Sequence, residues 1–515
     1  MNLKHLCCAA IIFFLVGCQS TPKDQNAQLL SNSHGYLVVN LPRFHPNVEV
    51  TNIATKKKYT LTTRINNTSG LWLPEGEYAI SKMGMQSKIK GFPTINVKTG
   101  TLTDMGSLIY FDLGDDQEIW IPKRLGNEEQ LIAPHIAKYS PYLSNQNSIV
   151  WQPKKMPLPS KSVMTSSGQG LVVDLISVYV HSVQEGALKK GLSDELDADQ
   201  FYNLAIKALP PIQSQIPASD NNQNLYYGAE LGVIKKRDAK GQWDIIQTNQ
   251  VSDIHIVRTL SNGKLLAANE AQQMIVEAPE QWQVVSQFEN NEKIQDIDIL
   301  GDKVYVITAD YEDVNYIPFG GNNYTLKVYE FDASNFASKK EIYSNFRKWG
   351  ARAHGKIVNN KYYIGLSPEL LDVIDLNTYQ TENLNVPQKF TNFNVLGEII
   401  TLYNQQGAFS DLFVSKDLGQ TWQELSTPPY TIGSILFESP TNGTAYRIAA
   451  NLADVSFFLQ KYDAQKNKWH NFSEAPRECK FILHDAEYFP RFCVTKSDEI
   501  MSYQNKQWSK ESSFL

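Results

Sequence analysis

The feature that most constrains the fold of this chain is a short segment that recurs at a nearly constant spacing after Leu225. In most copies a polar turn is followed by tryptophan and a strand of mixed polarity, and two copies are degenerate. A period of about 40–45 residues is typical of the four-stranded blades of β-propellers. The repeat predicts a seven-bladed β-propeller with an insertion in its longest step. The copies centre on Trp243, Trp282, Ile342, Leu384, Trp422, Trp469 and Trp508, at steps of 39, 60, 42, 38, 47 and 39 residues.

The other strands of each blade recur in phase with this segment. Their hairpins place Asn-Gly, Gly-Asp or Asn-Asn at the turn, where positive φ is needed. A single sheet leaves its faces uncovered, whereas sheets packed in a ring cover one another. The first blade lacks an innermost strand near residue 225, so we expect 170–180 to supply it. The helical interval 183–208, which Pro210-Pro211 ends, would then be an insertion in that blade.

The N-terminus carries an export signal. An apolar run from Leu6 to Val16 is too short to span a bilayer and is typical of a secretory signal. The sequence Leu15-Val16-Gly17-Cys18 resembles the lipobox of bacterial lipoproteins. This resemblance implies cleavage before Cys18 and lipidation of its thiol, so that the membrane is reached through an N-terminal lipid anchor. Gln19 at the next position implies the bacterial outer membrane; which side of that membrane the protein faces stays open.

These signals divide the chain into five parts: a lipoprotein signal peptide (1–17), a lipidated tether (18–34), a small β-sandwich (35–122), a linker (123–167) and the propeller (168–515). Short alternating runs separated by turns predict the sandwich, so the expected fold class is all-β. The sequence Leu73-Pro74-Glu75-Gly76-Glu77-Tyr78 resembles PEGA and carboxypeptidase-regulatory-like sandwiches, which implies a spacer or adhesion module. Residues 123–167 are rich in Pro, Ser, Asn and Gln, which is typical of a linker.

Cysteine usage and charge restrict the function further. Cys7 and Cys8 leave with the signal, so Cys479 and Cys493 remain as a pair in an oxidising compartment. We expect a disulfide that ties together the last blade, with a redox-active pair as the alternative. The net charge is −6 and no basic stripe is present, which argues against a nucleic-acid partner.

One turn matches a known motif. Ser415, Asp417, Gly419, Thr421 and Trp422 fit the Asp-box pattern S-x-D-x-G-x-T-W at every defined position. Here the chain resembles the Asp-box (BNR) propellers of sialidases, sortilin-type receptors and photosystem-assembly factors. The resemblance implies a structural role in which Asp417 closes the turn, Gly419 adopts a left-handed conformation and Trp422 packs between blades. Sialidases also have an Arg-Ile-Pro motif, which this sequence lacks.

Two segments are candidates for ligand binding. The insertion 309–324 offers aromatic faces that suit sugars or peptide side chains, and 343–355 is a cationic loop that suits a carboxylate or phosphate. Solvated loops with aromatic caps are the alternative interpretation of both. The candidate ligand-binding residues are Tyr311, Tyr316, Phe319, Tyr324, Arg347, Trp349, Arg352 and His354.

Acidic and histidine side chains also occur on the expected inner strands. Asp296 and Asp298 alternate along one expected inner strand, so both carboxyl groups would face the same way. Both side chains would line the channel, and acid–base catalysis by this pair is the alternative interpretation. His255 and His484 also lie on inner strands, where channel-lining or core roles are expected. No metal-ligand spacing and no glycine loop of the cofactor-binding type occurs, so we expect neither a metal nor a cofactor, and we assign no catalytic residue.

Together these features predict a non-enzymatic binding or scaffolding lipoprotein of the cell envelope. One face of its propeller would dock a protein or glycan partner. A sialidase-like glycoside hydrolase is the alternative function, and an envelope assembly factor is the second alternative.

Overall fold

Strands dominate the molecule, which confirms the expected all-β class. The computed structural model describes residues 31–513, apart from internal gaps of which the longest are 162–196, 204–215, 312–322 and 426–435. Cys18 and the whole signal and tether up to residue 30 therefore lie outside the described residues. Within the described part of the chain, no helix is long and apolar enough to cross a membrane.

From Ala218 onward, the described residues form seven four-stranded antiparallel sheets, each made of four consecutive strands. The first three are β12 (Ala218–Ser219), β13 (Leu225–Gly228), β14 (Val233–Arg237) and β15 (Trp243–Gln247); β16 (Ile254–Thr259), β17 (Leu265–Asn269), β18 (Gln273–Val276) and β19 (Gln283–Gln287); and β20 (Glu292–Leu300), β21 (Lys303–Tyr311), β22 (Asn323–Asp332) and β23 (Asn335–Lys348).

The remaining four sheets follow the same plan. They are β24 (Ala353–Val358), β25 (Lys361–Leu366), β26 (Leu370–Asp375) and β27 (Thr381–Leu384); β28 (Asn392–Leu396), β29 (Ile399–Gln406), β30 (Phe409–Ser415) and β31 (Gln423–Leu425); β32 (Leu436–Glu438), β33 (Ala445–Asn451), β34 (Ser456–Asp463) and β35 (Lys468–Glu474); and β36 (Cys479–His484), β37 (Pro490–Thr495), β38 (Glu499–Gln504) and β39 (Gln507–Ser513).

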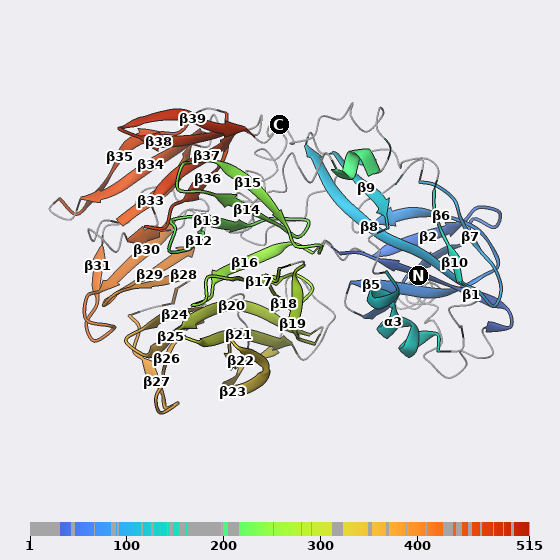
Figure 1. The fold of residues 1–515 in the computed structure, drawn as a ribbon, viewed down its shortest axis with the longest axis horizontal. Coiled ribbons are helices and arrows are strands. Elements are labelled where there is room, and N and C mark those ends of the chain that lie inside the picture. The colour runs from blue at the N-terminus through green and yellow to red at the C-terminus, as the bar shows by residue number, and fades with distance from the viewer. Residues whose placement is uncertain are drawn as a thin grey trace, which may run out of the picture.

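These seven sheets follow one another around a common centre (Figure 1). Their first strands lie toward the middle and most of their fourth strands lie at the rim. Hydrophobic cores form between adjacent sheets, and one such core joins residues of β12, β13 and β14 to residues of β16, β17 and β18. The first and last sheets also share a core, in which Tyr227 packs with Phe492 and Val494. These shared cores cover sheet faces that a single four-stranded sheet would leave exposed, which is why sheets this small can persist.

The repeated tryptophan segments all coincide with fourth strands or the residue directly before them. Three of these tryptophans reach back to the preceding sheet. The indole N–H of Trp422 donates to the backbone oxygen of Asn385 at 3.1 Å, and that of Trp508 donates to Ser473 Oγ at 3.2 Å. Trp243 of the first sheet donates to Glu511 of the last sheet. A large indole at this position therefore joins successive sheets.

Two further sheets precede the seven and share a single core. The larger one has the order β11-β9-β8-β1-β5-β4, with β10 beside β8, and the smaller one has the order β3-β2-β6-β7. In the segment that resembles PEGA domains, Tyr78 is fully buried and its hydroxyl donates to the Pro74 oxygen at 2.7 Å. The bounds are β1 (His34–Asn40), β2 (Val48–Asn52), β3 (Lys58–Thr60), β4 (Thr63–Ile65), β5 (Thr68–Pro74), β6 (Gly76–Met83), β7 (Ile95–Val97), β8 (Leu102–Gly114), β9 (Gln117–Lys123), β10 (Ser148–Val150) and β11 (Ser160–Lys161).

The segment 123–167 is not merely a linker, so that prediction is wrong. It contains the helix α3 (Glu128–Tyr139), and β10 and β11 add strands to the larger sheet. Ile132 and Ile136 of α3 pack against Tyr36 and Val38 of β1, which gives this stretch its own buried face.

The innermost strand of the first four-stranded sheet also differs from the prediction. Ala218–Ser219 pairs with β13 and occupies that edge, whereas 170–180 lies outside the described residues. Of the predicted helix 183–208, residues 199–203 are described and helical. Phe201 there packs on Phe111 of β8, and Asp199 pairs with Lys123 of β9. This short helix therefore rests on the N-terminal sheets.

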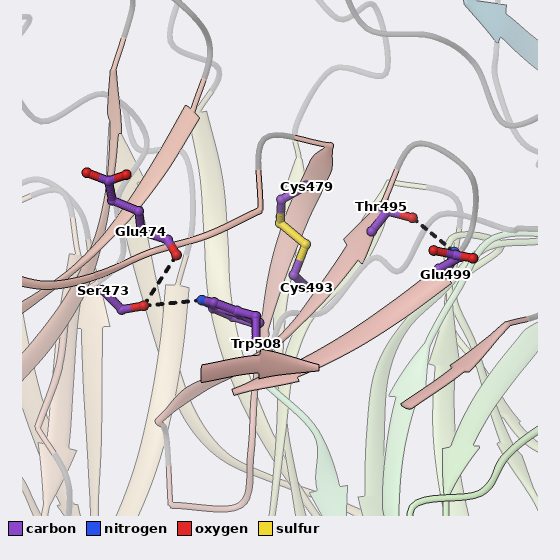
Figure 2. The surroundings of a disulfide bond; sticks show 7 residues. All are labelled: Ser473, Glu474, Cys479, Cys493, Thr495, Glu499 and Trp508. Carbon is purple, nitrogen blue, oxygen red and sulfur yellow. Dashed lines mark hydrogen bonds between the residues drawn. A yellow bond between two sulfur atoms is a disulfide. The ribbon is translucent and has the colours of Figure 1, made fainter. Parts of the chain in front are cut away.

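Cys479 and Cys493 form a disulfide in the last sheet (Figure 2). The bond joins β36 to β37, and both cysteines are buried. Trp508 lies in the same sheet, where its indole reaches Ser473 of the neighbouring one. The predicted pairing is confirmed, and it links two strands that the chain connects by a single hairpin.

Candidate functional site

Charged side chains from three neighbouring first strands meet around Asp296. The Asp296 carboxylate accepts a hydrogen bond from Arg258 Nη2 of β16 at 2.7 Å and one from the Gly355 backbone N–H of β24 at 3.0 Å. Arg258 contacts Oδ1 and Gly355 contacts Oδ2, and His354 Nδ1 lies 3.8 Å from Oδ2. Asp298, two residues along β20, shares this side of the strand. We call Arg258, Asp296, Asp298, His354 and Lys356 the inner-strand cluster.

The two carboxyl groups of this cluster have opposite pKa shifts. Burial opposes ionisation of Asp296, but the neighbouring His354, the Arg258 charge and the Gly355 N–H outweigh it and lower its pKa. The pKa of Asp298 is raised well above its usual value, first by burial and then by the negative charge of Asp296. Two carboxyl groups whose environments separate their pKa values in this way are able to act as base and acid.

Asp298 is also incompletely paired. Its Oδ2 atom is buried and, among the described residues, no group lies at hydrogen-bonding geometry to it. The Tyr362 side chain lies beside it, and Lys356 is close enough to act on its charge. A buried carboxyl oxygen without a partner is costly when ionised, which explains why the protonated form is favoured.

The predicted ligand-binding residues are only partly brought together. Tyr311, Tyr324 and Arg347 stand in one row across β21, β22 and β23, since Tyr311 pairs with Tyr324 and Tyr324 pairs with Arg347. Tyr324 has a packing role, because it is only 4% exposed and its ring lies against that of Tyr311 in a tilted arrangement. His354 instead belongs to the inner-strand cluster. Tyr316, Phe319, Trp349 and Arg352 lie outside the described residues.

Arg347 is held by a buried network and not in a loop. The prediction that 343–355 forms a loop is wrong for its first part, because β23 extends to Lys348. Arg347 Nη2 donates to Asp372 Oδ2 at 3.0 Å, the Tyr343 hydroxyl donates to the same oxygen, and Asn383 donates to the other at 2.7 Å. Asp372 is 3% exposed, so these donors stabilise a carboxylate between two sheets.

The turn from Ser415 to Trp422 is closed by its own side chains. Ser415 Oγ accepts from the Gly419 N–H at 2.7 Å, and Asp417 Oδ1 accepts from the Thr421 N–H at 2.9 Å. Hydrogen bonds from the side chains of Ser415 and Thr421 lower the pKa of Asp417 to about 2. Gly419 has φ of 93°, a value that favours glycine. Every one of these polar groups is used within the turn or against the neighbouring sheet.

The other inner-strand histidines divide into two environments. His484 is buried, and its backbone oxygen accepts from the Tyr227 hydroxyl at 2.6 Å across the first and last sheets. His255 lies on β16 with Nδ1 3.9 Å from Glu270. Among the described residues, no group of three or more His, Cys, Asp or Glu is placed to hold a metal ion.

Sequence reasoning did not single out Arg258, Lys356 or Asp372. Arg258 and Lys356 lie on inner strands, β16 and β24, and charged residues there carry a usable signal because such strands are mostly apolar. The role of Asp372 depends on which residues the next sheet presents to it, which the sequence does not display.

Comparison with known proteins finds no matching family model and no matching curated protein. Among solved structures, oligogalacturonate lyase in complex with manganese is 10% identical over 56% of this chain and 85% of its own, with a TM-score of 0.39. BamB from Moraxella catarrhalis is 12% identical over 59% and 85%, with a TM-score of 0.35. The acylaminoacyl peptidase of Pyrococcus horikoshii is 13% identical over 58% of this chain and 52% of its own, with a TM-score of 0.40.

Proposed function

We propose that this chain is a non-enzymatic binding or scaffolding lipoprotein of the bacterial outer membrane. Cys18 carries its lipid anchor, the two N-terminal sheets form a β-sandwich spacer, and the seven later sheets are the blades of a closed propeller. One face of that propeller docks a protein or glycan partner. The observation that carries the binding role is the inner-strand cluster, because three successive sheets contribute charged groups to one place.

Three features support the other parts of this proposal. The lipobox-like sequence ending at Cys18 supports export and anchoring. The Cys479–Cys493 disulfide fits an oxidising compartment. Contacts between the first and last sheets support closure into a ring, and closure removes exposed sheet edges.

The lipid anchor is tested by replacing Cys18. We expect Cys18→Ala to move the protein from the membrane fraction to the soluble fraction, because the acyl chains provide most of the membrane affinity. Immunoblots of fractionated cells measure this change. Cys8→Ala is the matched control, since Cys8 lies in the apolar run before the proposed cleavage site and should leave the protein in membranes. Membrane retention of Cys18→Ala would contradict the anchor.

A glycan-processing enzyme is the second candidate function. It is favoured by the opposite pKa shifts of Asp296 and Asp298, which resemble an acid–base pair. Incubation with a panel of glycans separates the two functions. Glycan release that disappears in Asp298→Asn would establish the enzyme, whereas binding of a partner without turnover would support the scaffold.

A further inference from the structure

The inner-strand cluster has its positive groups outside and its negative groups inside. The side chains of Arg258 and His354 are 32% and 45% exposed, whereas that of Asp296 is 11% exposed. Asp298 is buried as well, and Lys356 is half-buried. A ligand that reaches this surface therefore meets a guanidinium and an imidazole before it meets a carboxylate.

The charges of the cluster do not cancel. Arg258 and Lys356 are both cationic, and His354 adds charge when it is protonated. Asp296 is the carboxylate that ionises readily, while burial favours the protonated form of Asp298. While Asp298 holds its proton, the balance on this surface is positive, so an anion is attracted and a cation is repelled.

The exposed groups are also fixed in place before any ligand binds. Arg258 Nε donates to the Ile297 oxygen at 2.5 Å, and Nη1 donates to the Val257 oxygen at 3.0 Å. His354 turns Nδ1 toward Asp296, so that Nε2 lies on the opposite edge of the ring. Such preorganisation lowers the entropy that a ligand must remove on binding.

We propose that Arg258 and His354 form the contact surface of a site for an oxyanion, either a carboxylate or a phosphate group, on the ligand of this protein. This inference rests on the proposed binding role and specifies its chemistry. Guanidinium and imidazole groups donate together to oxygens of such a group, and the buried Asp296 keeps both donors oriented.

The test uses calorimetric titration of the full-length protein in detergent with three probes of similar size. These are glucuronate for the carboxylate, glucose 6-phosphate for the phosphate, and glucose as the uncharged control. We expect saturable binding of at least one anionic probe and none of glucose, and the preferred anion identifies the group. Arg258→Gln should weaken the binding about tenfold.

Arg491→Gln is the matched control variant. Arg491 contacts Asp485 at 2.7 Å and is 34% exposed, so it resembles Arg258 in pairing and exposure but lies on the last sheet. His354→Gln is a second test variant that removes a half-exposed side chain, in case Arg258→Gln fails to fold. The site is overturned if Arg258→Gln binds the anion as tightly as Arg491→Gln does. If Arg258→Gln does not fold, the same comparison is made with His354→Gln. The site is also overturned if the native protein binds neither anion. Equal binding of glucose would overturn the oxyanion preference but leave the binding role standing.

Discussion

At the scale of single residues, the most distinctive feature is the buried Asp298. Its carboxyl group keeps a proton more readily in the folded protein than in the unfolded chain, because burial and the charge of Asp296 raise its pKa. The folded state therefore binds more protons than the unfolded state above the usual pKa of aspartate. In that range the free energy of unfolding falls as pH rises, by up to about 1.4 kcal/mol per pH unit until the folded pKa is passed.

Asp298→Asn should remove this loss of stability. We expect the variant to be more stable than the native protein at pH 8, with the difference shrinking toward pH 4, where the folded protein holds this proton and the unfolded chain begins to bind it as well. Thermal melts across this pH range measure the effect. Asp296→Asn provides the contrast, because a carboxyl group with a lowered pKa stabilises the fold at high pH, so its loss should destabilise there. A difference for Asp298→Asn that does not vary with pH would contradict the raised pKa.

Some residue roles could be predicted from the sequence and others could not. The pairing of Cys479 with Cys493 was predictable because they are the only two cysteines that follow residue 18, and the resemblance to a lipoprotein signal implied an oxidising compartment. Arg347 was misassigned because its partner, Asp372, is contributed by the next sheet. Contacts between sheets depend on which faces are apposed, and spacing along one strand does not contain that information.

At the scale of elements, the turn between β30 and β31 shows how local chemistry determines backbone shape. Gly419 has φ of 93°, and a Cβ atom built there would lie 2.8 Å from Leu384 Cδ1. Gly397, in the β28–β29 hairpin of the same sheet, has φ of 58° with nothing within 4 Å of the corresponding position. The two glycines differ in whether crowding adds to backbone strain.

Gly419→Ala should therefore destabilise the protein more than Gly397→Ala does. We expect about 1–2 kcal/mol from the left-handed backbone alone at Gly397, and a larger loss at Gly419 because Leu384 must also move. Chemical denaturation of the two variants measures the difference. Equal losses would mean that the contact with Leu384 has no energetic consequence.

Strands could be predicted where the same sequence pattern recurs in every sheet. Short elements that occur only once in the chain could not. The tryptophan segments marked the fourth strands because the same packing need recurs at each sheet. Ala218–Ser219 was missed because two residues carry no alternating pattern. The helix α3 was missed because Pro134 lies within it, and proline in a sequence argues against a continuous helix.

At the scale of the whole molecule, the first and last sheets contact each other through a charged group that is buried between them. Arg237 of β14 donates through Nε to both carboxylate oxygens of Glu511 in β39, at 3.2 and 3.1 Å. The Trp243 indole N–H donates to the same carboxylate at 3.1 Å. The side chains of Arg237 and Glu511 are mostly buried, at 15% and 11% exposure. If one of them is removed, water cannot fully solvate the charge of the other.

Glu511→Ala should consequently destabilise the protein by about 3 kcal/mol, because it leaves the Arg237 charge buried without its partner. Glu382→Ala is the control, since Glu382 pairs with Lys361 at 3.2 Å on an exposed surface and its loss should cost less than about 1 kcal/mol. If the ring is closed, opening one junction exposes two sheet faces. Glu511→Ala should then lower the denaturant concentration at the midpoint of unfolding, and all seven sheets should unfold in the same transition. Denaturation followed by tryptophan fluorescence and by circular dichroism checks both points. A loss no larger than that of Glu382→Ala would contradict the role of this junction in closing the ring.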